Sequence, residues 1–189
     1  ETGMKVIEQE IHSLKNSISE MWALVHQQLY NAGEAMLTGD KELAYKVISR
    51  ERRVNAFELK IDSDCEDIIA LYAPVAIDLR FVLAMYKINT NLERLGDFAE
   101  SIARFAGNLP EGEPIDPQLV KETRVEEMLS ELLSMISLTK EAFEKESSEI
   151  ASRIFLKDNL IDEINHNSTA IIAKYIEEHK GSALAGLYM

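Results

Sequence analysis

Apolar residues recur every three or four positions along most of the chain. The first such segment runs from about Met4 to Leu37, and its apolar positions begin at Ile7, Ile11 and Leu14. This spacing places apolar side chains along one side of an α-helix and continues over about four heptads. The same pattern predicts further helices over about 41–72, 75–109, 118–145 and 147–179, and the start of a sixth near residue 182. Because no alternating β pattern occurs, we predict an all-α protein.

Helix-breaking residues separate these segments. Gly39 and Asp40 suit the end of one helix and the start of the next. Pro74 ends the second helix and can open the third. Three of the four prolines and two of the eight glycines lie between residues 107 and 117. We therefore predict a first three-helix unit over 4–109, a linker over 110–117 and a second, incomplete unit over 118–189.

A stripe of polar residues follows one side of the third predicted helix. At about 100° per residue, the members fall within about 60° of Glu93. The stripe comprises Asn89, Glu93, Gly96, Asp97 and Glu100. A glycine inside a helix costs roughly 1 kcal/mol relative to alanine. Gly96 therefore indicates that another group comes close to the backbone within the carboxylate stripe.

A second stripe follows the second predicted helix and has the same chemistry. Its members lie within about 80° of one another, and they are Glu51, Asn55, Glu58, Asp62 and Cys65. One acidic stripe is most often a solvated helix face. A lone cysteine in such a helix is more often buried packing than a ligand, and we expect that of Cys65.

The two halves of the chain align as an internal repeat. Adding 107 to the residue numbers of the second helix places apolar residues on apolar residues, for example Val47 on Ile154. The polar stripe follows in the same register. Glu51, Asn55, Glu58 and Asp62 fall on Asp158, Asp162, Asn165 and Thr169. A solvated face has no reason to match in this way, so the register favours a function for the stripes.

Composition limits the possible partners. The net charge of −13 disfavours nucleic acid, whose phosphates such a surface repels, and suits cations or basic proteins. One cysteine permits no internal disulfide and is typical of a reducing compartment. We found no apolar run of membrane-spanning length and no secretory signal, so we expect a cytoplasmic protein without a membrane span.

The donor atoms of the stripes favour hard metal ions. Carboxylate and amide oxygens suit Mg²⁺, Ca²⁺, Mn²⁺ and iron better than structural zinc. The sequence has no Cys-x-x-Cys or His-x-x-x-His pattern and no clear pair of nucleophile and base. We therefore predict a metal-binding protein. A hydrolase would need a metal site with an open position, which the stripes neither exclude nor require. The predicted ligands are Glu51, Asn55, Glu58, Asp62, Glu93, Asp97, Glu100, Asp158 and Asp162.

The depth of each acid along the second and third helices predicts which acids meet. The two helices should be antiparallel neighbours because only a short turn joins them. Counting from Pro74, Glu51 matches Asp97 in depth, whereas Asp62 and Asp97 differ by roughly 16 Å at 1.5 Å per residue. We therefore expect Glu51 and Asn55 near Glu93 and Asp97. Glu58 and Asp62 would then require partners from the second half.

Three motifs together resemble the PhoU family of bacterial phosphate-uptake regulators. They are Glu51-x-x-x-Asn55-x-x-Glu58-x-x-x-Asp62, then Pro74-Val75-Ala76-x-Asp78-Leu79-Arg80, then Leu92-Glu93-Arg94-Leu95-Gly96-Asp97. The resemblance covers residues 5–189. The second copy of the last motif would begin beyond Met189, so we expect the second three-helix repeat to be truncated at its last helix.

The resemblance implies a specific function. PhoU proteins consist of two repeats of a three-helix bundle and carry acidic motifs that bind metal clusters on the protein surface. The resemblance therefore implies bound metal ions, and we expect iron, manganese or magnesium here rather than zinc. The family is not known for enzymes, so the resemblance implies that this protein is not one. The family associates with the ATPase subunit of the phosphate ABC transporter and with a sensor histidine kinase, and it represses phosphate-starvation genes. This implies a cytoplasmic homodimer that reaches the inner membrane through its partners. A metal-dependent phosphohydrolase, or an accessory protein of another phosphate transporter, remains the alternative.

Overall fold

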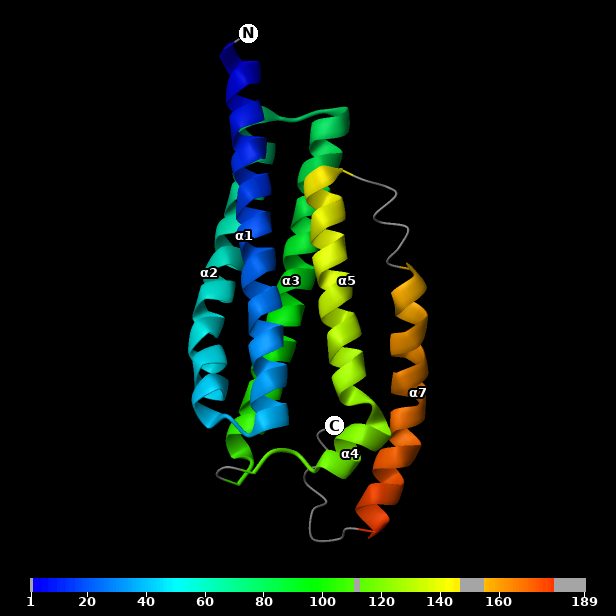
Figure 1. Ribbon diagram of the computed structural model, residues 1–189. Coiled ribbons are helices and arrows are strands. Elements are labelled where there is room, and N and C mark those ends of the chain that lie inside the picture. The colour runs from blue at the N-terminus through cyan, green and yellow to red at the C-terminus, as the bar shows by residue number, and fades with distance from the viewer. Residues whose placement is uncertain (1, 111–112, 147–154, 179–189) are drawn as a thin grey trace.

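Three long helices form the main bundle of the molecule in the computed structural model, which describes residues 2–110, 113–146 and 155–178 (Figure 1). They are α1 (Thr2–Thr38), α2 (Lys41–Tyr72) and α3 (Ala76–Asn108). A second group follows, made of α4 (Pro117–Thr123), α5 (Val125–Lys145) and α7 (Phe155–Glu178). The described residues contain no strand, which confirms the all-α prediction.

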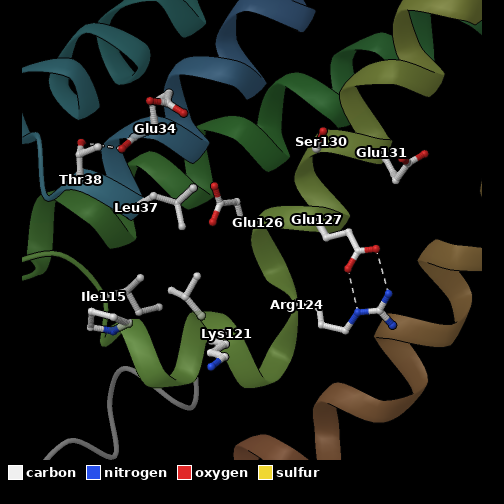
Figure 2. Close-up of a pocket in the computed structure, with 12 residues that line it drawn as sticks. Glu34, Leu37, Thr38, Ile115, Lys121, Arg124, Glu126, Glu127, Ser130 and Glu131 are labelled. Carbon is white, nitrogen blue, oxygen red and sulfur yellow. Dashed lines mark hydrogen bonds and ion pairs between the residues drawn. The ribbon is translucent and has the colours of Figure 1, made fainter.

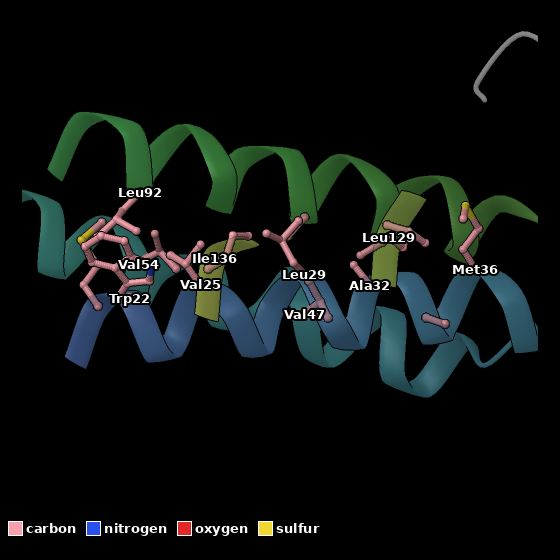
Figure 3. Close-up of a cluster of buried hydrophobic side chains, with 14 of the residues drawn as sticks. Trp22, Val25, Leu29, Ala32, Met36, Val47, Val54, Leu92, Leu129 and Ile136 are labelled. Carbon is pink, nitrogen blue, oxygen red and sulfur yellow. The ribbon is translucent and has the colours of Figure 1, made fainter. Parts of the chain in front are cut away.

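The main core lies where α1 meets α2 and α3. Leu14, Ile18 and Val25 on α1 are fully buried, as are Val47 and Val54 on α2. Figure 3 shows a row of α1 side chains, from Trp22 to Met36, that points toward α3, with Leu129 and Ile136 of α5 in the same cluster. The apolar period of the first segment therefore forms intramolecular core, as the amphipathic pattern predicts.

Local signals set the ends of α2 as predicted. The side chain of Asp40 accepts a hydrogen bond from the backbone N–H of Leu43 at 2.9 Å, which caps the first turn. Gly39 has a φ of +71°, and a Cβ there would lie 2.9 Å from the backbone carbon of Glu113. Ala73 ends the helix in the left-handed conformation, with a φ of 44°, directly before Pro74.

The prediction of one continuous helix from Gln118 to Lys145 is wrong, because the segment forms two helices, α4 and α5. Arg124 takes a φ of 54° and separates α4 from α5, which run in different directions in Figure 1. Thr123 turns its hydroxyl back to the carbonyl of Leu119 at 2.7 Å, and Arg124 forms ion pairs with Glu127 and with Glu163 of α7. In α5 Val125, Leu129 and Ile136 are buried, and Met128, Leu132 and Phe143 are partly buried against the core.

The remaining helices pack beside the main bundle. α5 contacts α1, with the rings of Trp22 and Phe143 stacked at 5.6 Å, and α7 contacts α4 and α5. The hydroxyl of Tyr175 on α7 donates to Asp116 at 2.7 Å. The predicted sixth helix, from about Ser182, lies outside the described residues. None of the described helices is long and apolar enough to cross a membrane.

Candidate metal site

The two acidic stripes meet across the antiparallel pair α2 and α3. Gly96 makes this close approach possible, since a Cβ there would lie only 2.8 Å from Cγ1 of Val54 and 3.5 Å from Oε1 of Glu51. The structure therefore identifies the group that approaches the glycine: it is the second helix itself. Any larger side chain at position 96 would push the two stripes apart.

Three acids converge at this contact. Glu51 of α2 and Asp97 and Glu100 of α3 each offer one carboxylate oxygen, and these three oxygens lie within 4.8 Å of one another. This is the match in depth between Glu51 and Asp97 that the residue count predicts. Three carboxylates at such range repel one another unless protons or a cation compensate their charge.

Glu51 is the most unusual of these acids. Its side chain is only 5% exposed, and neither of its carboxylate oxygens has a hydrogen-bond partner. Burial, followed by the negative charges of Glu100, Asp97, Glu93 and Glu58, raises the pKa of Glu51 to about 7. A buried carboxylate without partners is costly, which indicates that a ligand belongs at this position.

Two further acids are affected by the same cluster. Burial raises the pKa of Glu93, and a hydrogen bond with Asp97 and the charges of Asp97 and Glu58 raise it further. Burial and the charges of Asp62 and Asp97 likewise raise the pKa of Glu58. Glu58 therefore lies within the field of the first-half acids and shares their repulsion.

Asp62 has a partner within the same helix pair. The amide nitrogen of Asn89, which is fully buried on α3, donates to Asp62 at 2.8 Å and to the carbonyl oxygen of Glu58 at 3.0 Å. Asp62 therefore has a hydrogen-bond partner inside the first half. That acids of the second half also meet Glu58 and Asp62 stays a prediction. Asn89 belongs to the predicted stripe, but the sequence does not indicate that it holds Asp62.

The donor set of the cluster fits a hard cation. All the nearby donors are oxygens, and several carboxylates face a single point. Arg104 binds one oxygen of Glu100, Oε1, and leaves Oε2 outside that ion pair. Cys65 is not a ligand candidate, because its buried thiol donates to the carbonyl of Val82 and burial raises its pKa to about 11. It is packing, as expected.

Other predicted ligands remain untested by this geometry. Asn55 is exposed on α2, one turn after Glu51. Asp158 and Asp162 lie on α7, but their side chains are outside the described part of the structure. A metal site in the second half therefore stays a prediction.

Two other features lie away from the acids. A pocket of about 770 Å³ opens between the end of α1, α4 and the start of α5, with Glu126 beside Leu37 and with Arg124 bound to Glu127 (Figure 2). His26 of α1 and Ser137 of α5 lie 3.1 Å apart through Nε2 and Oγ, a pair that sequence reasoning missed because their helices are distant in the chain.

Comparison with known proteins identifies the family of this chain. The domain described as "PhoU domain" matches residues 18–106. The chain is 33% identical over 171 residues to the "Phosphate-specific transport system accessory protein PhoU homolog" of Aquifex aeolicus, covering 89% of this chain and 75% of that protein. The chain belongs to the PhoU family. A PhoU homolog of Thermotoga maritima is 31% identical and covers 96% of this chain and 78% of its own length.

Solved PhoU structures have the same fold. The phosphate transport system regulatory protein PhoU from Streptococcus pneumoniae superposes with a TM-score of 0.80 at 28% identity, covering 96% of this chain and 84% of that one. PhoU from Pseudomonas aeruginosa gives a TM-score of 0.84 at 25% identity, covering 96% and 85%. These relatives are named as accessory or regulatory proteins.

Proposed function

We propose that this PhoU protein is a metal-binding accessory protein of phosphate uptake. The names of its relatives support the link to phosphate transport. The observation that supports a bound metal ion is the state of Glu51: its carboxylate is buried, has no hydrogen-bond partner and lies close to the carboxylates of Asp97 and Glu100. An iron, manganese or magnesium ion there would neutralise the charges that no protein group compensates.

The cluster assigns roles to individual residues. Glu51, Asp97 and Glu100 would hold the ion, because their oxygens converge. Glu58 and Glu93 would serve a neighbouring ion or complete the first, since both lie in the field of the same acids. The ion would supply charge neutralisation and would tie α2 to α3, which gives the protein a rigid acidic face.

The regulatory role completes the proposal. We expect the protein to connect the ATPase subunit of the phosphate ABC transporter to a sensor histidine kinase and to repress phosphate-starvation genes when phosphate is plentiful. A homodimer is expected, since dimers are the commonest soluble assembly. The protein would act by binding rather than by catalysis, in keeping with the accessory names of its relatives.

A reporter experiment tests this role. In a bacterium that lacks its own PhoU, a phosphate-starvation promoter should stay active in phosphate-rich medium, and expression of this chain should silence it. The Glu93→Ala/Asp97→Ala variant should fail to silence it at equal protein abundance, because it loses carboxylates from the cluster. A matched variant, Glu66→Ala/Asp67→Ala, alters two exposed acids of α2 and should silence normally. A promoter that stays active with the wild-type chain would refute the regulatory role.

A further inference from the structure

Helix α3 carries opposite charges on two different sides. Its acids Glu93, Asp97 and Glu100 face the contact with α2. Arg80, Lys87 and Arg94, here called the basic stripe, recur at intervals of seven residues. At about 100° per residue they lie within about 40° of one another. The acid nearest in angle, Asp97, lies about 60° from Arg94, about 80° from Lys87 and about 100° from Arg80.

The cations of the basic stripe are exposed, and the charge of Arg94 partly offsets the upward shift of the pKa of Glu93. None of the three forms an ion pair within the part of the chain that the structure describes. Between Asp78 and Glu93 the sequence of α3 contains no acidic residue. In a chain of net charge −13, three exposed cations at one angle of a helix are a distinct local feature, although Glu93 and Asp97 lie close to Arg94 at one end of the row.

Exposed apolar side chains accompany these cations. Phe98 is 62% exposed and lies at the same angle around the helix as Arg80, and Leu83 is 48% exposed on the adjoining side. The surface is therefore both basic and apolar, because Phe98 and Leu83 are exposed beside the three cations of the basic stripe. Aromatic and arginine side chains are the residues that most often contribute binding energy at protein interfaces.

We infer that the basic stripe of α3 is a docking surface for an acidic amphipathic helix of a partner protein. The stripe spans about 21 Å from Arg80 to Arg94 and about 27 Å to Phe98 at 1.5 Å per residue, which is the length of a partner helix of about 15–20 residues. Acids repeating every seventh residue would face the cations, and apolar residues between them would cover Leu83 and Phe98. Charge complementarity of this kind sets the register and orientation of docking.

The shape of the stripe favours a helix over a broad anionic surface. A helix with its side chains is about 10–12 Å wide and can follow the stripe alone. A membrane or a nucleic acid extends beyond the stripe and meets the acid cluster on the neighbouring side of α3. Since charges interact over about 8 Å at physiological ionic strength, those acids and the net charge of −13 would oppose such an approach.

Binding of a designed peptide tests the inference. The probe is a fluorescent 21-residue helical peptide with glutamate at every seventh position and leucine between, and its partner probe carries lysine in place of glutamate. The chain should bind the glutamate peptide saturably and not the lysine peptide. Charge reversal of the stripe, Arg80→Glu/Lys87→Glu/Arg94→Glu, should weaken binding at least about tenfold, and so should raised salt.

The matched control reverses three cations of α2, Lys41→Glu/Arg50→Glu/Arg53→Glu, and changes the net charge equally. It should alter the affinity by less than about twofold. Phe98→Ala should weaken binding without any change of charge. The inference fails if both triple variants weaken binding alike, if the glutamate peptide does not bind, or if phosphatidylserine vesicles bind in a stripe-dependent way. The inference draws its partner class from the proposed adaptor role, but the peptide assay needs neither metal nor reporter, so the two can fail separately.

Discussion

Replacing Glu51 by glutamine is expected to stabilise the metal-free protein and to abolish its stabilisation by metal. The two effects have opposite signs because the buried carboxylate destabilises the folded protein when no cation is present and binds the cation when one is. In the folded state the pKa of Glu51 is raised from 4.5 to about 7. Deprotonation therefore costs more in the folded than in the unfolded protein.

The sign of the pH dependence follows from this shift. Between pH 4.5 and about 7 the folded protein holds the proton of Glu51 more tightly than the unfolded chain does. The metal-free protein should thus lose stability as the pH rises through this window, by up to about 3 kcal/mol. Glutamine carries no charge, and its amide can donate to a neighbouring carboxylate. The variant should remove this loss and melt about 4–12 °C higher near pH 8.

Thermal melting with and without Mn²⁺ measures both effects. The wild-type protein should gain about 3 kcal/mol when the ion is present at a hundredfold excess over its dissociation constant. Glu51→Gln should gain little. The control Glu66→Gln alters an exposed acid of the same helix and should leave both curves unchanged. A metal-free Glu51→Gln protein that melts lower than wild type at high pH would contradict the account.

Replacing Gly96 by alanine should disrupt the site from the opposite helix. Alanine normally favours a helix over glycine by roughly 1 kcal/mol. At this position its methyl group would lie 2.8 Å from Val54 and about 3.5 Å from Glu51, inside a close-packed contact. We expect a net loss of about 1–2 kcal/mol in the free energy of unfolding and at least a tenfold loss of metal affinity, because α3 must move away from α2.

The same substitution at Gly107 is the matched control for Gly96→Ala. Gly107 lies in the last turn of α3, and a Cβ there meets only the ring of Tyr45 at 3.8 Å, an ordinary contact. Gly107→Ala should therefore be neutral or stabilise by up to about 1 kcal/mol. Denaturant unfolding of the two variants gives the comparison. Equal effects at the two positions would show that the close approach at Gly96 does not matter.

The sequence predicted those parts of the structure that depend on local signals. The hydrophobic period predicted the long helices, and Asp40 and Pro74 marked the ends of α2, because caps and prolines act within one turn. The break at Arg124 has no such signal. No glycine or proline occurs there, and Arg124 is tied instead to Glu163 on a helix that is distant in sequence.

The candidate site was predictable as far as helix geometry reaches. Angle and depth along two antiparallel helices were enough to bring Glu51 to Asp97. They could not show that both oxygens of Glu51 are buried without partners, because burial depends on how α1, α2 and α3 pack. For the same reason they did not reveal that Asn89, fully buried between helices, holds Asp62.

The central claim is that the acids of α2 and α3 hold a metal ion, and anomalous diffraction tests it most directly. Crystals of the protein grown with Mn²⁺ should be measured at a wavelength where manganese scatters anomalously. We predict a peak bounded by Glu51, Asp97 and Glu100, with oxygen ligands at about 2.1–2.3 Å. The peak should be absent in Glu51→Gln crystals grown in the same way. Wild-type crystals with no anomalous peak between these three residues would contradict the account.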